Sequence, residues 1–419
     1  MSDLFSDSGT PQNMIRDILG IISKGLYEKE HIIALGLLCA FSGESFFLLG
    51  LPGTAKSEVS RRLKLVFREA KSFEYLMSRF STPDEIFGPV SIKKLKEEDI
   101  YERQIEGYLP DADVVFLDEI WKAGPSIQNS LLTVLNEKIY RNGRSTIKLP
   151  MKLLIAASNE IPEKGSGLEA LWDRFIMRVV SEGVRDEKNF FALIRSNGSG
   201  ITGIPTAYQI TPEVYAEWQT KILQVEIPDE ILGYLSQLRK ILAKKDEDGN
   251  SIYVSDRRWV KISRLLRTSA FLNSRNKVDW SDLLLLRHCL WGQVNEIPLV
   301  TKAIIDALIY QGYSELEAIE DQIAMISKQR VWFLPYNNTR KRDPSSLQTE
   351  ALIPKVEKEL DETAKQIISN GKLLKQSDNI FISSFDWELV GQHFRSVLNR
   401  VEEAKKKLKN ERDRYNQGS

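Results

Sequence analysis

The sequence predicts an α/β protein in which a core built on a parallel β-sheet is followed by helical parts. Four short apolar runs, at Ser45–Gly50, Val114–Leu117, Leu153–Ala157 and Phe175–Val180, are separated by helical or polar segments. That alternation is typical of a parallel sheet covered on both faces. A glycine-rich turn follows the first run and leads into a helix-periodic segment, Glu58–Ala70. Near the end of the chain, apolar residues recur at intervals of three and four, the pattern of long packed helices.

At 419 residues the chain is long enough for two or three domains. Loop-like composition at Ser196–Pro205 marks a boundary, and helices dominate beyond it, with Pro212 and Pro228 at predicted helix starts. We predict an αβα core over residues 1–195, a small all-helical domain over 196–300, and a discontinuous triple-helical domain over 301–330 and 350–419. A connecting loop is expected at 331–349.

The triple-helical domain is predicted from three apolar stripes at helical spacing. The stripes are Leu316, Ile319, Ile323 and Ile326; Val356, Leu360, Ala364 and Ile367; and Trp387, Val390, Phe394, Val397, Val401, Ala404 and Leu408. Each stripe gives one helix a face to bury against the other two.

The composition excludes several classes of protein. Lysine plus arginine and aspartate plus glutamate each number 58, so no global positive field gathers nucleic acid or anionic membrane. Cys39 and Cys289 both lie in apolar, helix-like surroundings, which argues against a disulfide framework or a zinc site. The N-terminus lacks a targeting pattern, and the apolar run Ile32–Phe41 is too short to span a bilayer. We therefore expect a cytoplasmic protein without a membrane span.

The turn after the first apolar run has the composition of a phosphate-binding loop. It consists of Gly50, Leu51, Pro52, Gly53, Thr54, Ala55, Lys56 and Ser57. Between a strand and a helix, the backbone N–H groups of such a loop can wrap a phosphate chain. Lys56 would neutralise β- and γ-phosphate oxygens, and Ser57 would give its hydroxyl to Mg²⁺. The alternative, a plain glycine turn with a surface lysine, does not account for strand, spacing, Lys-Ser and helix together.

Ala55 departs from the usual pattern, which has glycine before the lysine. A tight loop accepts alanine there, we expect, only if its φ angle is negative.

The second apolar run ends in two adjacent carboxylates, Asp118 and Glu119. Burying acids at a strand end is costly unless a cation or a proton-transfer task uses them. We expect Asp118 to hold Mg²⁺ through water and Glu119 to activate the attacking water. A helix-capping acid at a strand-to-loop junction is the alternative.

The third apolar run ends at Asn159, at the carboxyl edge where ligands bind open α/β sheets. Asn159 could contact the γ-phosphate or the attacking water. Alone, such an asparagine is more often a turn residue, but beside the other two motifs we favour the functional role.

Together these motifs resemble the MoxR family of AAA+ ATPases, and within it the RavA branch. The resemblance rests on segments spread from Lys24 to Trp259. They are Lys24–Glu28, Ser42–Ser45, the phosphate loop, Phe73–Pro83, Phe116–Pro125, Ala156–Glu160 and Val254–Trp259. It implies a P-loop AAA+ αβα core, an all-α lid, a C-terminal triple-helical module and a hexameric ring with ATP between subunits. Ala55 also resembles the residue that the RavA branch has at this position of the loop.

The resemblance also implies roles for arginines. In Leu171–Phe175, Arg174 matches the finger that reaches the neighbouring subunit's γ-phosphate; otherwise it would be read as half of an exposed pair with Asp173. Arg257 resembles the lid arginine that senses nucleotide in its own subunit, with Arg258 as the other choice and a solvated helix start as the alternative.

Further positions follow from the same resemblance. Tyr27 resembles residues near the adenine, although an aromatic there is more often core packing. The segments Thr82–Gly107 and Lys138–Pro150 fit insertions that carry pore-facing loops, unless they are ordinary solvated surface. The candidate exposed residues are Tyr101, Arg141, Asn142 and Arg144.

The partners implied are protein partners. The β-rich domain that docks a lysine decarboxylase in the RavA branch is replaced here by the short segment Trp332–Gln348, so we do not expect that interaction. A partner with a von Willebrand A module is implied instead.

We therefore expect an ATP- and Mg²⁺-dependent motor that remodels or activates a partner protein. A nucleotide-switched binding scaffold is the first alternative. A nucleic-acid translocase is the second, and only the basic stretches Arg330–Trp332 and Thr339–Arg342 favour it.

Overall fold

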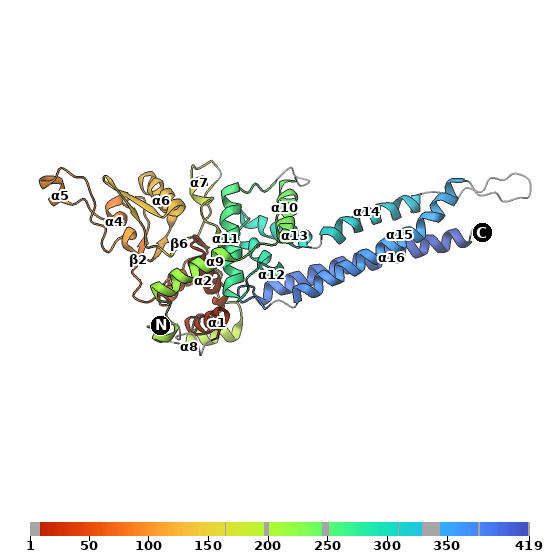
Figure 1. Cartoon of the computed structure of the whole chain (residues 1–419), viewed down its shortest axis with the longest axis horizontal. Helices are drawn as coiled ribbons and strands as arrows, with labels where there is room; N and C mark the ends of the chain where they lie inside the picture. The colour runs from red at the N-terminus through yellow and green to blue at the C-terminus, as the bar shows by residue number, and fades with distance from the viewer. Residues whose placement is uncertain are drawn as a thin grey trace, which may run out of the picture. The chain divides into compact units, whose positions relative to one another are not determined.

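The computed structural model of the chain describes residues 9–163, 165–196, 201–244, 251–308, 310–328, 344–375 and 378–417 (Figure 1). The chain divides into two compact units. The first comprises residues 1–231, 250–297 and 379–382, and the second comprises 232–249, 298–378 and 383–419. Residues 197–200 of the predicted boundary loop, most of the predicted connecting loop and the two basic stretches lie outside the described residues.

The first unit contains the predicted parallel sheet. Its strands are β1 (Phe46–Leu49), β2 (Ser72–Leu76), β3 (Val114–Asp118), β6 (Leu153–Ser158) and β7 (Met177–Val180). They pair in the order β2-β3-β6-β1-β7, and every pair is parallel. The four predicted apolar strands are confirmed, with β7 starting two residues later than the apolar run.

The edge strand β2 was missed by the sequence analysis. Phe73 is buried, but Ser72, Glu74 and Leu76, which share one face of the strand, are exposed, because that face is not covered. The segment therefore lacks the continuous apolar run of the central strands.

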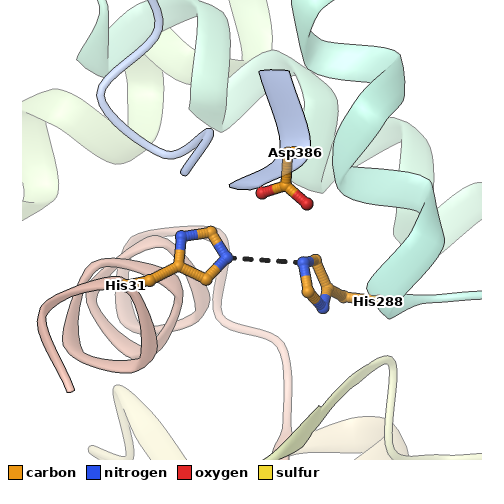
Figure 2. A group of neighbouring side chains, drawn as sticks. All are labelled: His31, His288 and Asp386. Carbon is orange, nitrogen blue, oxygen red and sulfur yellow. Dashed lines mark hydrogen bonds between the residues drawn. The ribbon is translucent and has the colours of Figure 1, made fainter. Parts of the chain in front are cut away.

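Helices α2 (Glu30–Ser42) and α3 (Lys56–Lys64) pack against this sheet, α2 on β6 and β7 and α3 on β3. Nearly every residue of α2 is buried, as expected of a helix that is apolar on all sides. In the first turn of α2, the Nε2 atom of His31 lies 3.4 Å from the Nε2 atom of His288, so one imidazole donates a hydrogen bond to the other (Figure 2). This contact joins α2 to the 3-10 helix η4 (Leu284–His288).

The other elements of the first unit are mostly short helices. They are α1 (Pro11–Ile22), α4 (Pro83–Phe87), α5 (Ile92–Glu97), η1 (Leu109–Asp111), η2 (Ile120–Lys122), α6 (Pro125–Glu137), α7 (Glu169–Trp172), α8 (Glu187–Arg195), η3 (Thr206–Tyr208), α9 (Pro212–Gln224), α11 (Asp256–Leu272), α12 (Trp280–Leu283) and η5 (Val294–Glu296). As predicted, α9 begins at Pro212, and Thr211 caps it.

The two predicted insertions contain regular structure. Residues 82–107 carry α4 and α5, and α5 lies at the end of an arm that extends away from the sheet (Figure 1). The second insertion is a hairpin of β4 (Ile139–Asn142) and β5 (Ser145–Lys148).

The expectation that Asn142 is exposed was wrong, because its side chain is buried. Its Oδ1 accepts a 2.7 Å hydrogen bond from the Arg103 backbone N–H, and its Nδ2 donates to the Arg103 carbonyl. Asn142 therefore fastens the hairpin to the arm, whereas Tyr101, Arg141 and Arg144 are exposed as expected.

The second unit is helical. Its helices are α13 (Ile297–Leu308), α14 (Tyr310–Lys328), α15 (Pro344–Lys375), α16 (Ser384–Gln417) and most of α10 (Asp229–Ala243). The long helices α14, α15 and α16 lie side by side and all contact one another (Figure 1). All three predicted stripes are buried apart from Trp387, which is half-buried, so the triple-helical module is confirmed.

One boundary in this unit was predicted wrongly. We expected residues 344–349 to belong to the connecting loop, but α15 begins at Pro344. Proline suits the first helical turn, where its missing N–H leaves no hydrogen bond unmade.

A buried polar cluster fixes residues 379–382 within the first unit. The Asp282 carboxylate, fully buried, accepts hydrogen bonds from Arg275, the Ser269 hydroxyl and the Asn379 side-chain amide at 2.6–3.0 Å. Burial raises the pKa of Asp282, while the Arg275 guanidinium favours the charged form. The cluster is stable only as a whole, because each member satisfies the others.

Removing the cation from this cluster should be far more harmful than removing one from the surface. Arg275→Met leaves Asp282 buried without its ion pair, so we expect the free energy of unfolding to fall by about 3–5 kcal/mol. Lys277→Met is the matched control, because the Lys277–Glu226 pair at 2.9 Å is exposed and is worth at most about 1 kcal/mol. Urea unfolding followed by tryptophan fluorescence measures both, and equal losses would contradict the assignment.

Candidate functional site

The phosphate loop lies where β1 leaves the sheet. The Gly50 N–H donates to the Ser158 carbonyl of β6 at 3.0 Å, so the loop starts from a fixed point on the sheet. A Cβ atom at position 50 would come within 2.3 Å of the Ser181 carbonyl oxygen, and Gly53 has φ +81°. Glycine is therefore required at both positions, by close packing at the first and by backbone conformation at the second.

Two polar side chains of the loop, Thr54 and Lys56, are buried. Lys56 Nζ donates to the carbonyls of Gly50 at 2.6 Å and Leu51 at 3.1 Å. Thr54 Oγ1 donates to the Leu51 carbonyl at 2.9 Å, and Ser57 lies in the first turn of α3. The arrangement places an ammonium group and a hydroxyl within one loop at a helix N-terminus, where anions are stabilised.

The expectation that Ala55 has a negative φ was wrong. Ala55 adopts the left-handed conformation, with φ 63° and ψ 24°, directly before α3. The loop therefore needs the backbone shape that glycine normally supplies, and alanine adopts it at a cost of about 1–2 kcal/mol. The surrounding loop hydrogen bonds hold this strained residue in place.

Asp118, Glu119 and Asn159 meet at the same edge of the sheet as the phosphate loop. β6 lies between β1 and β3, with Leu49 paired to Ser158 and Leu117 paired to Ala156. Because the strands are parallel, all three end at one edge. Asn159, the residue after β6, thus follows the strand that separates the phosphate loop from the two acids.

Glu119 has an unusual environment for an acid. Its backbone is left-handed, with φ 54°, and its N–H donates to Asp118 Oδ1 at 3.0 Å. Glu119 Oε2 is buried and accepts no hydrogen bond from the residues that the structure describes, but it forms an ion pair with Lys122 Nζ at 3.3 Å. A buried carboxylate oxygen that makes an ion pair but accepts no hydrogen bond can still accept one from a water molecule.

A small cavity of about 130 Å³ opens beside the phosphate loop. Its lining includes Tyr27, Leu26, Gly53, Ala55 and Leu193. Tyr27 is half-buried and lines this cavity together with residues of the loop. The cavity joins apolar side chains to loop backbone, a combination suited to an aromatic base attached to phosphates.

A second cluster surrounds Asp173. Arg257 Nη2 lies 2.5 Å and Arg258 Nη1 3.5 Å from its carboxylate oxygens, and the Ser255 hydroxyl donates to it at 3.3 Å. Burial opposes ionisation of Asp173, but the hydrogen bond from Arg257 and the charge of Arg258 outweigh it, and the pKa of Asp173 is lowered.

Arg174, half-buried, follows directly. Its Nε donates to the Leu132 carbonyl at 3.2 Å and its Nη1 to the Ala170 carbonyl at 2.6 Å, and no hydrogen bond in the described part of the chain joins it to the phosphate loop. Burial and the nearby Arg257 charge lower its pKa. Arg174 and Arg257 therefore belong to one cationic cluster.

The structure distinguishes Arg257 from Arg258. Arg257 is exposed, whereas Arg258 is buried and donates to the Cys289 carbonyl at 2.7 Å. Sequence reasoning also missed Arg178, which is buried in the same cluster. Its strand pattern, Met177–Val180, gave no signal, since a charged residue inside an apolar strand is ordinarily placed on the solvent side.

In the part of the chain that the structure describes, no helix is long and apolar enough to cross a membrane.

Comparisons with known proteins agree with this geometry. A profile described as the MoxR domain in the MoxR-vWA-beta-propeller ternary systems matches residues 13–200, and an AAA lid domain profile matches residues 230–304. An uncharacterised protein of Methanocaldococcus jannaschii is 39% identical over 288 residues, which cover 69% of this chain and 72% of the relative. A second from the same organism is 34% identical over 324 residues, 76% of this chain and 84% of the relative.

Among solved structures, the chain is similar to a Cytophaga hutchinsonii protein presumed to be an ATPase. The TM-score is 0.56 at 18% identity, covering 70% of this chain and 94% of that one. This likeness shows the shared fold.

The sheet order, the phosphate loop with its paired acids and the matched profiles lead to one conclusion: the chain belongs to the MoxR family of AAA+ ATPases.

Proposed function

We propose that the chain binds and hydrolyses ATP with Mg²⁺ and uses the energy to remodel or activate a partner protein. The observation that carries the proposal is the meeting of three groups at one sheet edge: the phosphate loop with Lys56, the acids Asp118 and Glu119, and Asn159. Family membership supports the same activity.

The residues present fit a magnesium nucleotide. Ser57 and Asp118 supply hard oxygen ligands, which Mg²⁺ prefers, and the loop has the glycine-dependent shape of a phosphate cradle. When bound, the ion would neutralise charge on the phosphate oxygens. Tyr27 and its cavity would receive the base.

The chain's own groups then have distinct tasks. Lys56 would exchange its loop carbonyl contacts for phosphate oxygens, as a point charge can. Glu119 would accept a proton from the attacking water, because its Oε2 accepts no hydrogen bond from the described residues and is available to that water. The Asn159 amide would orient that water or the γ-phosphate.

We propose further that the site is shared between subunits of a ring, with six as the expected number. Arg174 lies in a cluster with Arg178, Arg257 and Arg258, and in the described part of the chain Asp173 forms ion pairs with two of them, Arg257 and Arg258. This excess of positive charge suits a phosphate supplied by a neighbour. Arg174 would act there as the finger. Arg257 would sense nucleotide in its own subunit, as expected from the sequence, or act beside Arg174, which its pairing with Asp173 favours.

The partner proposed is a protein with a von Willebrand A module. The matched profile describes systems in which a MoxR domain occurs with such a module and a β-propeller. We also propose that the chain belongs to the RavA branch and that its domains meet near residues 195 and 300. A lysine decarboxylase is not proposed as a partner.

A nucleotide-switched scaffold is the second candidate, favoured by the long helices α14–α16. ATPase rates with and without a von Willebrand A partner separate the two, since a motor is stimulated and a switch mainly changes affinity.

Replacing the acid that we assign to water activation should separate binding from hydrolysis. Glu119→Gln keeps the shape of the side chain, so ATP should still bind while the turnover number falls at least about 10²-fold. Glu160→Gln, an exposed acid at the same sheet edge, is the control and should change neither. Binding is measured with a fluorescent ATP analogue and turnover by phosphate release. Undiminished hydrolysis would remove Glu119 from the mechanism.

A shared site should show complementation between inactive subunits. Arg174→Ala subunits keep an intact phosphate loop, and Glu119→Gln subunits keep an intact Arg174. Mixing them should therefore restore part of the activity, and the gain should depend on the mixing ratio. Arg185→Ala, which removes an exposed arginine, serves as the control and should be active without mixing. If no ratio restores activity, Arg174 does not serve a neighbour.

A further inference from the structure

Two buried arginines hold the backbone on both sides of Arg174. Arg178, from β7, is fully enclosed. Its Nη2 donates to the Trp172 carbonyl at 2.8 Å, its Nε donates to the Phe175 carbonyl at 3.0 Å, and its Nη1 donates to the Trp291 carbonyl. The guanidinium also lies over the Trp172 ring, 3.7 Å from its centroid.

The second arginine comes from a different part of the chain. Arg258 lies in the first turn of α11, and its Nη2 donates to the Phe175 carbonyl at 3.2 Å. Its Nε donates to the Cys289 carbonyl, and its Nη1 lies 3.5 Å from Asp173. Carbonyls immediately before and after the Asp173–Arg174 pair are thus held by guanidinium groups.

This arrangement is expensive for a purely structural purpose. Burial lowers the pKa of both arginines. The charge of Arg258 lowers the pKa of Arg178 further, and the charge of Arg257 lowers that of Arg258. A well-packed apolar pair would often be as stable or more stable. What apolar side chains cannot do is fix several carbonyl oxygens at once, and the planar, multidentate guanidinium does that.

We propose that Arg178 and Arg258 are positioning residues for Arg174, and that Arg258 makes the placement of Arg174 follow helix α11. The inference rests on the proposed function, in which Arg174 completes the neighbour's ATP site. Since α11 begins within the segment that the lid profile matches, a shift of α11 is passed to Asp173 and the Phe175 carbonyl. A subunit's lid thereby controls the arginine that it offers to the next subunit.

The test replaces each arginine by lysine in the full chain. Lysine keeps the charge but cannot contact several carbonyls at fixed angles, so Arg258→Lys and Arg178→Lys should lower kcat about 10²-fold, the effect of a displaced catalytic group. Each variant's own phosphate loop is untouched, so its affinity for a fluorescent ATP analogue should not change.

Arg267→Lys is the matched control on the same helix. Arg267 donates to the carbonyls of Leu223 and Val225 through Nη1 alone, so a lysine ammonium can replace it. We expect its kcat and nucleotide affinity to equal those of the unmodified chain.

Mixing separates misplacement of Arg174 from general damage. Arg258→Lys subunits should regain activity beside Glu119→Gln subunits, which offer a correctly held Arg174 to an intact phosphate loop. Unchanged kcat, lost nucleotide binding or no recovery on mixing would each overturn the inference.

Arg174→Ala in the same assays distinguishes failure of the shared ATP site from failure of the positioning role of Arg178 and Arg258. If Arg174→Ala keeps full activity, the shared site of the proposed function fails. If Arg174→Ala is inactive while Arg258→Lys and Arg178→Lys are fully active, only the positioning role fails.

Discussion

The parallel pairing of β6 between β1 and β3 is the constraint on which the rest of the site depends. It brings three strand ends to one edge, although the residues after them are about 40 or more positions apart in the sequence. The hydrogen bond from Gly50 to Ser158 ties the phosphate loop to this edge. A slip of register between these strands would separate the lysine from the acids even if every helix remained intact.

Much of the fold could be predicted because its signals are periodic. The buried central strands are continuous apolar runs, and the three stripes of the helical module repeat over many turns, so errors at single positions average out. The edge strand β2 and the start of α15 have no such redundancy. Their assignment depends on which side of a strand is covered and on a proline that serves equally well in a loop or a first helical turn.

The linear motifs of the candidate site could be predicted, but the contacts between residues that are distant in the sequence could not. Lys56, Asp118 and Asn159 lie beside recognisable strands, so topology alone brings them together. The φ angle of Ala55 was predicted wrongly because alanine by itself prefers a negative φ, whereas this loop imposes a positive one. The sequence could not predict the role of Arg178 or the Asp173–Arg257 ion pair, because β7 and α11 come together only in the folded chain.

The placement of residues 379–382 within the first unit bears on how this protein can be dissected. The chain leaves the second unit after Asp378, contributes Asn379 to the cluster around Asp282, and returns at Ser383. The triple-helical module therefore cannot be exchanged between relatives by cutting the chain at a single junction. A shortened chain ending near residue 300 would lose a hydrogen-bond partner from the interior of its first unit, so a defect in such a chain is not evidence that the missing helices bind a partner.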